Sequence, residues 1–445
     1  MIALSPETIT IIMFGGILVG VLTGYPLAPV VAGVALLVGY VTWGGPVTEL
    51  FYTRMWELIR SYVILAVPLF VFMGLMLERS RIAERMYDAL YLWLGGFRGG
   101  LAISTVLIGT ILAACVGIIG ASVTMLTLVA LPAMLRRGYS KSFASGSVCA
   151  GGTLGILIPP SIMLVIYGPM AVLSVGKLFM AAIVPGLVLS GLYCIYIALR
   201  CLFQPKIAPA VSVEERSVPF VKKTTMLVTS LVPPALLILA VLGTIFLGIA
   251  PPTEAAGIGA FAAILLSIGY RRFSWQALKE TSLDTLRVGS MVLFIAVCGY
   301  MFTGVFLGLG GGKVVESFIL ATPGGRWASF AVVMLICFIL GMFIDWIGII
   351  FIMVPIITPI GAALGFDPLW FGMMICINLQ MSFMTPPFAY AIFYLRGAAP
   401  PALGVTTADI IRGVIPYVAL IIIGLGLCIV FPKLILWLPH QMIKF

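Results

Sequence analysis

Long stretches without charge alternate with short charged segments along the whole chain. The charge-free stretches cover residues 8–48, 61–77, 99–135, 142–176, 178–199, 224–253, 255–270, 288–312, 327–344, 346–366, 368–395 and 413–432. A helix needs about 20 apolar residues to cross a bilayer, so most of these stretches are long enough to span it or to enter it deeply. The first stretch is broken at Thr23-Gly24-Tyr25-Pro26 and predicts two helices. The pattern predicts an all-α polytopic membrane protein.

Composition excludes other classes. The 445 residues are 62% hydrophobic and 9% charged, with a mean hydropathy of +1.22, whereas soluble domains carry about 25% charged residues. A soluble enzyme, a disordered chain and a nucleic-acid-binding domain are therefore excluded. The eight cysteines form no CxxC pair and His440 is the single histidine, so the sequence predicts no zinc site, no organic cofactor and no enzyme.

Basic residues predict the orientation. If the first helix begins outside, 18 of the 25 Lys and Arg fall in segments on the cytoplasmic side, as the positive-inside rule requires. Both termini are then periplasmic, and the net charge of +10 is no sign of nucleic acid. The charged stretch from Glu78 to Arg98 predicts an interfacial arm helix.

The two halves of the chain resemble each other. With an offset of 227, residues 132–168 align with 359–395 without a gap. Identical pairs are Pro132/Pro359, Gly138/Gly365, Cys149/Cys376, Pro159/Pro386, Pro160/Pro387 and Tyr167/Tyr394. The loop before the first copy is basic and the loop before the second is not, so the copies should have opposite orientations. Paired Gly/Pro-broken segments in inverted halves indicate a secondary transporter with a mid-membrane site; ordinary proline kinks are the alternative.

Each half contains a candidate re-entrant hairpin. Residues 99–135 have a glycine-containing centre at 116–122, and residues 327–366 have one at 341–348. An arm of about 15 residues reaches about 22 Å, short of the roughly 30 Å hydrocarbon core. Two short full spans are the alternative.

Each half also contains a candidate broken helix. Residues 140–168 are interrupted at 151–155 and 158–161, and residues 368–395 at 378–387. Glycine permits non-helical backbone, and proline frees an upstream carbonyl. Free carbonyls and hydroxyls can replace the water shell of a cation, and helix N-termini attract anions.

Asp345 lies at the centre of an apolar hairpin. A carboxylate within the membrane is costly and indicates a function, here binding or balancing a cation. A helix N-cap is the alternative. Glu254 starts a span and indicates a capping carboxylate.

These residues resemble one family, the large membrane subunit of tripartite ATP-independent periplasmic (TRAP) transporters. The matching segments are 137–140, 152–162, 252–256, 341–345 and 378–387, and the resemblance covers essentially the whole chain. It implies an elevator-type fold of two inverted repeats, each with scaffold helices, an interfacial arm helix, a re-entrant hairpin and a broken helix.

The resemblance divides the chain into six parts. Repeat 1 supplies scaffold and arm helices (1–98), the first transport-domain part (99–176), and a closing helix with a cytoplasmic linker (177–223). Repeat 2 supplies scaffold and arm helices (224–325), the second transport-domain part (326–405), and a final helix with a tail (406–445).

The resemblance also implies sodium-coupled uptake of an organic acid across the inner membrane of a bacterium or archaeon. A periplasmic binding protein would deliver the substrate, and a separate small four-helix membrane subunit would complete the scaffold. The amino-acid sequence around residues 380–397 resembles a branch of the family whose substrates are keto acids or other monocarboxylates.

Site residues are carried over from the family by position. Sodium site 1 is expected at Gly120, Ser122, Gly152, Thr153 and Gly155. Sodium site 2 is expected at Asp345, Gly348, Gln380, Ser382 and Thr385. The substrate is expected near Ser122, Pro160, Asn378 and Thr385, and no metal other than sodium is expected. Trp346 departs from the small or polar residue usual after the hairpin aspartate.

A stand-alone sodium–carboxylate symporter of the divalent anion family is the alternative function. It would act as a homodimer without a binding protein. Its usual Ser-Asn-Thr tip signatures are absent from this sequence, which counts against it.

Overall fold

The computed structural model describes residues 4–212 and 218–441, and these ranges contain helices and no strands. Part of the predicted linker and both chain ends lie outside the described residues. The first half contains α1 (Pro6–Leu22), α2 (Leu27–Trp43), α3 (Pro46–Ile59), η1 (Tyr62–Leu65), α4 (Ala66–Arg79), α5 (Ile82–Leu94), α6 (Gly100–Val116), α7 (Ile119–Arg136), α8 (Lys141–Thr153), η2 (Leu154–Ile156), α9 (Ile162–Met170) and α10 (Val175–Phe203). The second half contains α11 (Phe220–Phe246), α12 (Pro252–Gly269), α13 (Trp275–Gly308), α14 (Gly311–Leu320), α15 (Gly325–Gly341), α16 (Trp346–Ala363), α17 (Pro368–Ser382), α18 (Tyr390–Ala398), η4 (Pro401–Leu403), α19 (Thr407–Val430) and α20 (Lys433–His440).

The helices have the length and polarity of membrane spans. Within the described residues, eight helical segments are long and apolar enough to cross a bilayer, and four shorter apolar helices accompany them. The all-α polytopic class is confirmed. The shorter set includes α1, α2 and α15.

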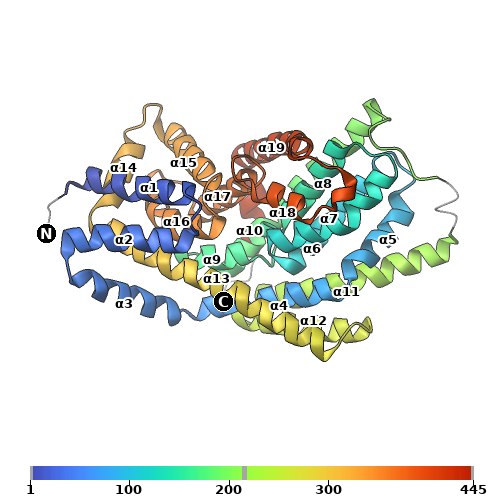
Figure 1. Ribbon diagram of the computed structural model, residues 1–445, viewed down its shortest axis with the longest axis horizontal. Coiled ribbons are helices and arrows are strands. Elements are labelled where there is room, and N and C mark those ends of the chain that lie inside the picture. Colours follow the sequence, from blue (N-terminus) through green and yellow to red (C-terminus); the bar gives the residue numbers. More distant parts are fainter. Residues whose placement is uncertain (1–3, 213–217, 442–445) are drawn as a thin grey trace.

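Two helical hairpins form where the uncharged stretches have glycine at their centres. The first hairpin, α6 and α7, turns at Gly117, whose φ of +64° suits glycine. The second hairpin, α15 and α16, turns between Gly341 and Trp346. Figure 1 shows the two hairpins in opposite halves of an elongated molecule, with α10, α17 and α18 between them.

A broken helix follows each hairpin. The first consists of α8 and α9 and is interrupted over 154–161; the second consists of α17 and α18 and is interrupted over 383–389. A long helix comes next in both cases, α10 or α19. The same order of elements thus occurs twice. The inversion of the two copies remains a prediction.

The breaks begin later than the glycines suggested. Gly151 and Gly152 belong to α8, and Asn378 and Gln380 belong to α17. Glycine is tolerated inside a helix at a cost of about 1 kcal/mol when close packing needs it. The following 3-10 turn and the prolines end the helices instead.

Two further elements could not be delimited from the uncharged stretches. The charged residues before position 288 belong to α13, a continuous helix of 34 residues. The charged segment Pro46–Ile59 forms α3, which hydrophobic stretches alone did not indicate. In the first half, by contrast, α5 is separate, because Arg81 between α4 and α5 has a φ of +54°.

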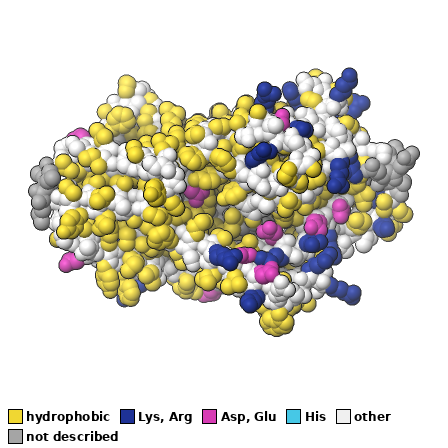
Figure 2. Space-filling model, in the orientation of Figure 1, with side chains coloured by type: hydrophobic (Ala, Val, Ile, Leu, Met, Phe, Trp, Pro, Cys, Tyr) yellow, Lys and Arg dark blue, Asp and Glu magenta, His cyan; other side chains and the backbone are white. Residues whose placement is uncertain are grey.

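The broken helices lie at the centre of the protein. Every residue of α8 from Phe143 to Thr153 is buried, as is every residue of α17 from Trp370 to Ser382. Charged groups lie outside this core: in Figure 2, Lys and Arg side chains gather over one half of the visible face. There Arg79, at the end of α4, forms salt bridges with Glu280 and Asp284 near the start of α13.

Candidate functional site

The first hairpin packs directly onto the end of α8. A Cβ added to Gly109 of α6 would lie 2.5 Å from the carbonyl oxygen of Gly151. A Cβ added to Gly152 would lie 2.5 Å from Cγ2 of Val123 on α7. Any residue larger than glycine at position 109 or 152 would therefore clash with its neighbour. The two hairpin arms therefore hold adjacent glycines of the broken helix.

This contact brings several predicted residues of sodium site 1 together. Ser122 precedes Val123 and is fully buried, and its Oγ has no hydrogen-bond partner. Thr153 donates from Oγ1 to the Ala150 carbonyl at 3.1 Å and lies 3.7 Å from the sulfur of Met384 in the second break. Gly155 is buried in the 3-10 turn after α8.

Gly120 has a different neighbour. A Cβ added there would lie 3.0 Å from Cε1 and Cζ of Tyr394 on α18. Its α-carbon therefore faces the second broken helix, while Val123 on the same helix faces the first.

The second hairpin closes on α17 in a comparable way. A Cβ added to Gly341 would lie 2.5 Å from both Cβ and Oγ of Ser382. Ser382 donates to the Phe338 carbonyl at 3.2 Å, and the Phe388 N–H donates to the Met342 carbonyl at 3.2 Å. Hydrogen bonds from both sides of the second break thus reach the end of the hairpin's first arm.

Gln380 lies on α17 between Asn378 and Ser382. Its side chain is fully buried, and neither Oε1 nor Nε2 has a hydrogen-bond partner. Buried polar atoms are nearly always satisfied, so an unsatisfied pair needs an explanation such as a bound ion or water.

Asp345 occupies the N-cap position of α16, with φ −63° and ψ 150°. Its side chain forms no capping hydrogen bond. The N-cap interpretation therefore describes the position of Asp345 but leaves its charge without a fixed partner.

Two predicted site residues, Gly348 and Asn378, are engaged in contacts with neighbouring helices. A Cβ added to Gly348 would lie 2.4 Å from Cδ2 of Leu27 on α2, so this glycine faces α2. Asn378 donates from Nδ2 to the Met334 carbonyl at 2.8 Å and is only 2% exposed. Its amide nitrogen thereby holds α17 to α15.

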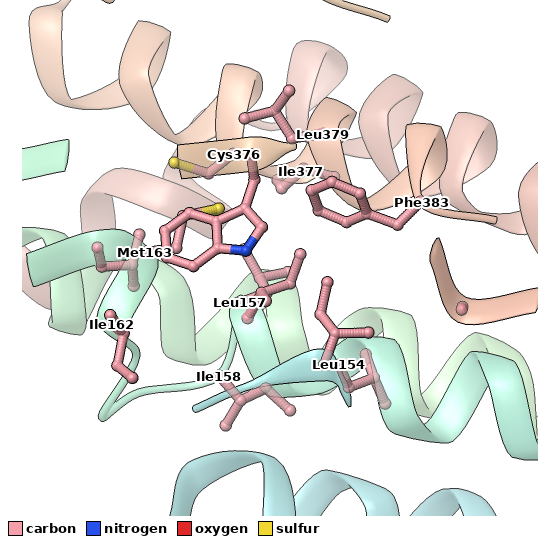
Figure 3. Close-up of a cluster of buried hydrophobic side chains, with 14 of the residues drawn as sticks. Leu154, Leu157, Ile158, Ile162, Met163, Cys376, Ile377, Leu379 and Phe383 are labelled. Atoms are coloured by element: carbon pink, nitrogen blue, oxygen red, sulfur yellow. The ribbon is translucent and has the colours of Figure 1, made fainter. Parts of the chain in front are cut away.

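The two breaks differ in exposure. Residues 154–161, including Pro160, are buried, whereas Pro386 and Pro387 are exposed and Thr385 is half-buried. Thr385 donates from Oγ1 to the Met381 carbonyl at 2.9 Å. Figure 3 shows why the first break is closed: its apolar side chains lie against those of α17 in one cluster. The labelled members include Leu154, Leu157, Ile158, Cys376, Ile377, Leu379 and Phe383.

Two features of the site were missed or underrated from the sequence. Tyr394, not included among the predicted site residues, is 42% exposed and lies against Gly120. Thr303 of α13 donates to the Phe351 carbonyl of α16 at 2.8 Å. Pro355, four residues after Phe351, has no N–H that could bond to the Phe351 carbonyl. The position of Pro355 in the sequence could therefore have indicated that this carbonyl needs another donor.

A polytopic helical protein with two hairpins closing on two broken helices has the architecture of a membrane transport protein. Its fold is similar to that of the YdaH transporter from Alcanivorax borkumensis, with a TM-score of 0.60 and 16% sequence identity over 89% of each chain.

Sequence comparison is more specific. The family model for the DctM component of tripartite ATP-independent periplasmic transporters matches residues 10–434. A C4-dicarboxylate TRAP transporter large permease protein from Pseudomonas aeruginosa is 32% identical, covering 87% of this chain and 88% of that protein. A sialic acid TRAP transporter large permease protein from Vibrio cholerae is 29% identical, covering 86% and 87%. The chain belongs to the DctM family of TRAP transporter large permease subunits, and it is a transport protein of the membrane, not an enzyme.

Proposed function

We propose that this permease takes up an organic acid by sodium-coupled, elevator-type movement of its hairpins and broken helices. The carrying observation is that each hairpin packs onto a broken helix. Two buried polar side chains of these elements also lack partners, Ser122 on the first hairpin and Gln380 on the second broken helix.

Sodium suits the donors at these positions. A hard cation prefers carboxylate, carbonyl, hydroxyl and amide oxygens. The Ser122 Oγ and the Gln380 Oε1 are such oxygens, and both lack partners. Asp345 adds a carboxylate that forms no salt bridge with any Lys or Arg of the described chain. Gly120, Gly152, Thr153 and Gly155 of site 1, and Gly348, Ser382 and Thr385 of site 2, remain proposed backbone or hydroxyl contributors.

The proposed substrate is an organic carboxylate. Both relatives named above transport acids according to their names. The second break is exposed, and Thr385 and Pro387 in it precede the N-terminus of α18. The free N–H groups at a helix N-terminus can bind an anion. Ser122, Pro160 and Asn378 complete the substrate set proposed from the family, although the Asn378 nitrogen is already engaged.

Elevator movement requires α16 to slide past a fixed α13. In the present arrangement Thr303 satisfies the carbonyl that Pro355 leaves free. Sliding would break this hydrogen bond. The bond therefore stabilises the present arrangement relative to the one reached by sliding.

Replacing Thr303 with valine tests this role. Loss of one neutral hydrogen bond costs about 1 kcal/mol, which corresponds to about a fivefold change in an equilibrium. We expect the fraction of molecules in this arrangement, measured by single-molecule FRET between labels on α13 and α16, to fall accordingly. Sodium half-saturation should not change.

Thr358→Val is the matched control on the same helix. Thr358 donates only within α16, to the Val354 carbonyl at 2.7 Å. Equal shifts in the two variants would contradict the proposed role of Thr303.

We further propose two partners, a small membrane subunit and a periplasmic binding protein. The test is uptake of labelled organic acids into proteoliposomes that contain this chain and the small subunit, with and without the binding protein, under an inward sodium gradient. Uptake that needs both sodium and the binding protein supports the proposal. Sodium-driven uptake without a binding protein would instead favour a stand-alone symporter.

A further inference from the structure

One aromatic side chain of the second broken helix packs on the first hairpin. Tyr390 and Tyr394 are one turn apart on α18 and therefore share a face of that helix. The Tyr394 ring covers Gly120 near the start of α7, with Cε1 and Cζ 3.0 Å from the position of an added Cβ.

The repeat provides an internal comparison. Tyr167 is the counterpart of Tyr394 at the offset of 227 and is fully buried. Its ring packs against Gly372 of α17, 2.8 Å from the position of an added Cβ. Tyr394 also packs against a glycine, yet 42% of it is exposed. Packing against glycine explains the whole environment of Tyr167. For Tyr394 it leaves a substantial part of the side chain without contact with the rest of the protein.

The open second break leads directly into the helix that carries Tyr394. Pro386 and Pro387, just before α18, are exposed as well. A tyrosine combines an apolar ring with a hydroxyl donor, and such side chains suit sites where one end is apolar and the other polar. A hydrogen bond to a carboxylate is stronger than one to a neutral acceptor.

We propose that Tyr394 is a substrate-binding residue whose hydroxyl donates a hydrogen bond to the organic acid, and that Gly120 sets the position of its ring. This inference rests on the proposed function. Tyr394 thereby connects the substrate to the first hairpin through Gly120.

Tyr394→Phe is the first test, measured as uptake in the proteoliposomes described above. We expect KM for the substrate to rise at least about tenfold, because a hydrogen bond to a charged group contributes about 1.5–3 kcal/mol. The maximum rate and the melting temperature of the purified protein should change little.

Tyr196→Phe is the matched control. Tyr196 is half-buried and packs edge-on against Tyr417, with ring centroids 5.2 Å apart. We expect its KM to equal that of the unmodified protein. An unchanged KM in Tyr394→Phe would overturn the proposal.

The contribution of Gly120 is tested with a double-mutant cycle. The methyl group of Gly120→Ala displaces the Tyr394 ring by a few tenths of an ångström, so KM should rise severalfold. In a Tyr394→Ala background the same substitution should have no further effect on KM, because the ring is absent. An equal rise in both backgrounds would overturn the positioning role of Gly120. Failure of the unmodified protein to transport would count against the proposed function itself and not against this residue.

Discussion

Replacing Asp345 with asparagine is expected to raise the sodium concentration for half-maximal uptake by about thirtyfold or more. The carboxylate lies at the tip of the second hairpin and has no basic partner among the described residues. Removing one member of a buried charge pair costs about 2–5 kcal/mol, and each 1.4 kcal/mol is a factor of ten. Initial uptake rates over a sodium titration measure the effect.

Glu254→Gln is the control for Asp345→Asn. Glu254 lies in the first turn of α12, where a carboxylate interacts favourably with the helix dipole by about 0.3–1 kcal/mol. We expect the sodium half-saturation of this variant to stay within about twofold of the unmodified protein, since the interaction of one carboxylate with the helix dipole is small in energy. Equal effects of the two substitutions would exclude a special role for Asp345.

Replacing Gly152 with alanine is expected to lower uptake at least about tenfold and to lower the melting temperature. The new methyl group would lie 2.5 Å from Val123 Cγ2 and 3.0 Å from Val123 Cα. Because one of these atoms is backbone, α7 has to move away from α8. Overpacking of this kind costs about 1–3 kcal/mol, and the movement displaces Ser122 from the first break.

Gly191→Ala is the matched control for Gly152→Ala. Gly191 is a glycine of α10 with no atom within 4 Å of an added Cβ. Alanine favours a helix over glycine by about 1 kcal/mol, so this variant should be as stable as the unmodified protein or slightly more stable. Comparable losses of uptake in both variants would show that the contact with Val123 is not responsible.

The positions of helices and breaks were predictable because they depend on local properties. Uncharged length predicted the spans, and Gly117, Pro159-Pro160 and Pro386-Pro387 lie in the turns and breaks of the structure. The continuity of α13 from Trp275 to Gly308 was not predictable, because its charged first part and its apolar second part look like separate segments in the sequence. Short-range pattern also gave no indication of α3.

The environment of each polar residue was not predictable. Asn378 and Gln380 are two residues apart on α17, yet the Asn378 nitrogen bonds to Met334 and the Gln380 amide has no partner. Gly348 faces α2, while Gly341 of the same hairpin faces Ser382. These differences depend on helices that are remote in sequence.

The class of protein, its spans, its interruptions and its family follow from the amino-acid sequence alone, because hydrophobic length and backbone chemistry act within a few neighbouring residues. Which glycines allow close packing and which hydroxyls lack partners became clear from the three-dimensional arrangement of the helices. This arrangement also determines that Tyr394 is exposed while its repeat counterpart Tyr167 is buried. Burial and hydrogen-bond satisfaction depend on which helices pack together, and that packing is a property of the whole chain.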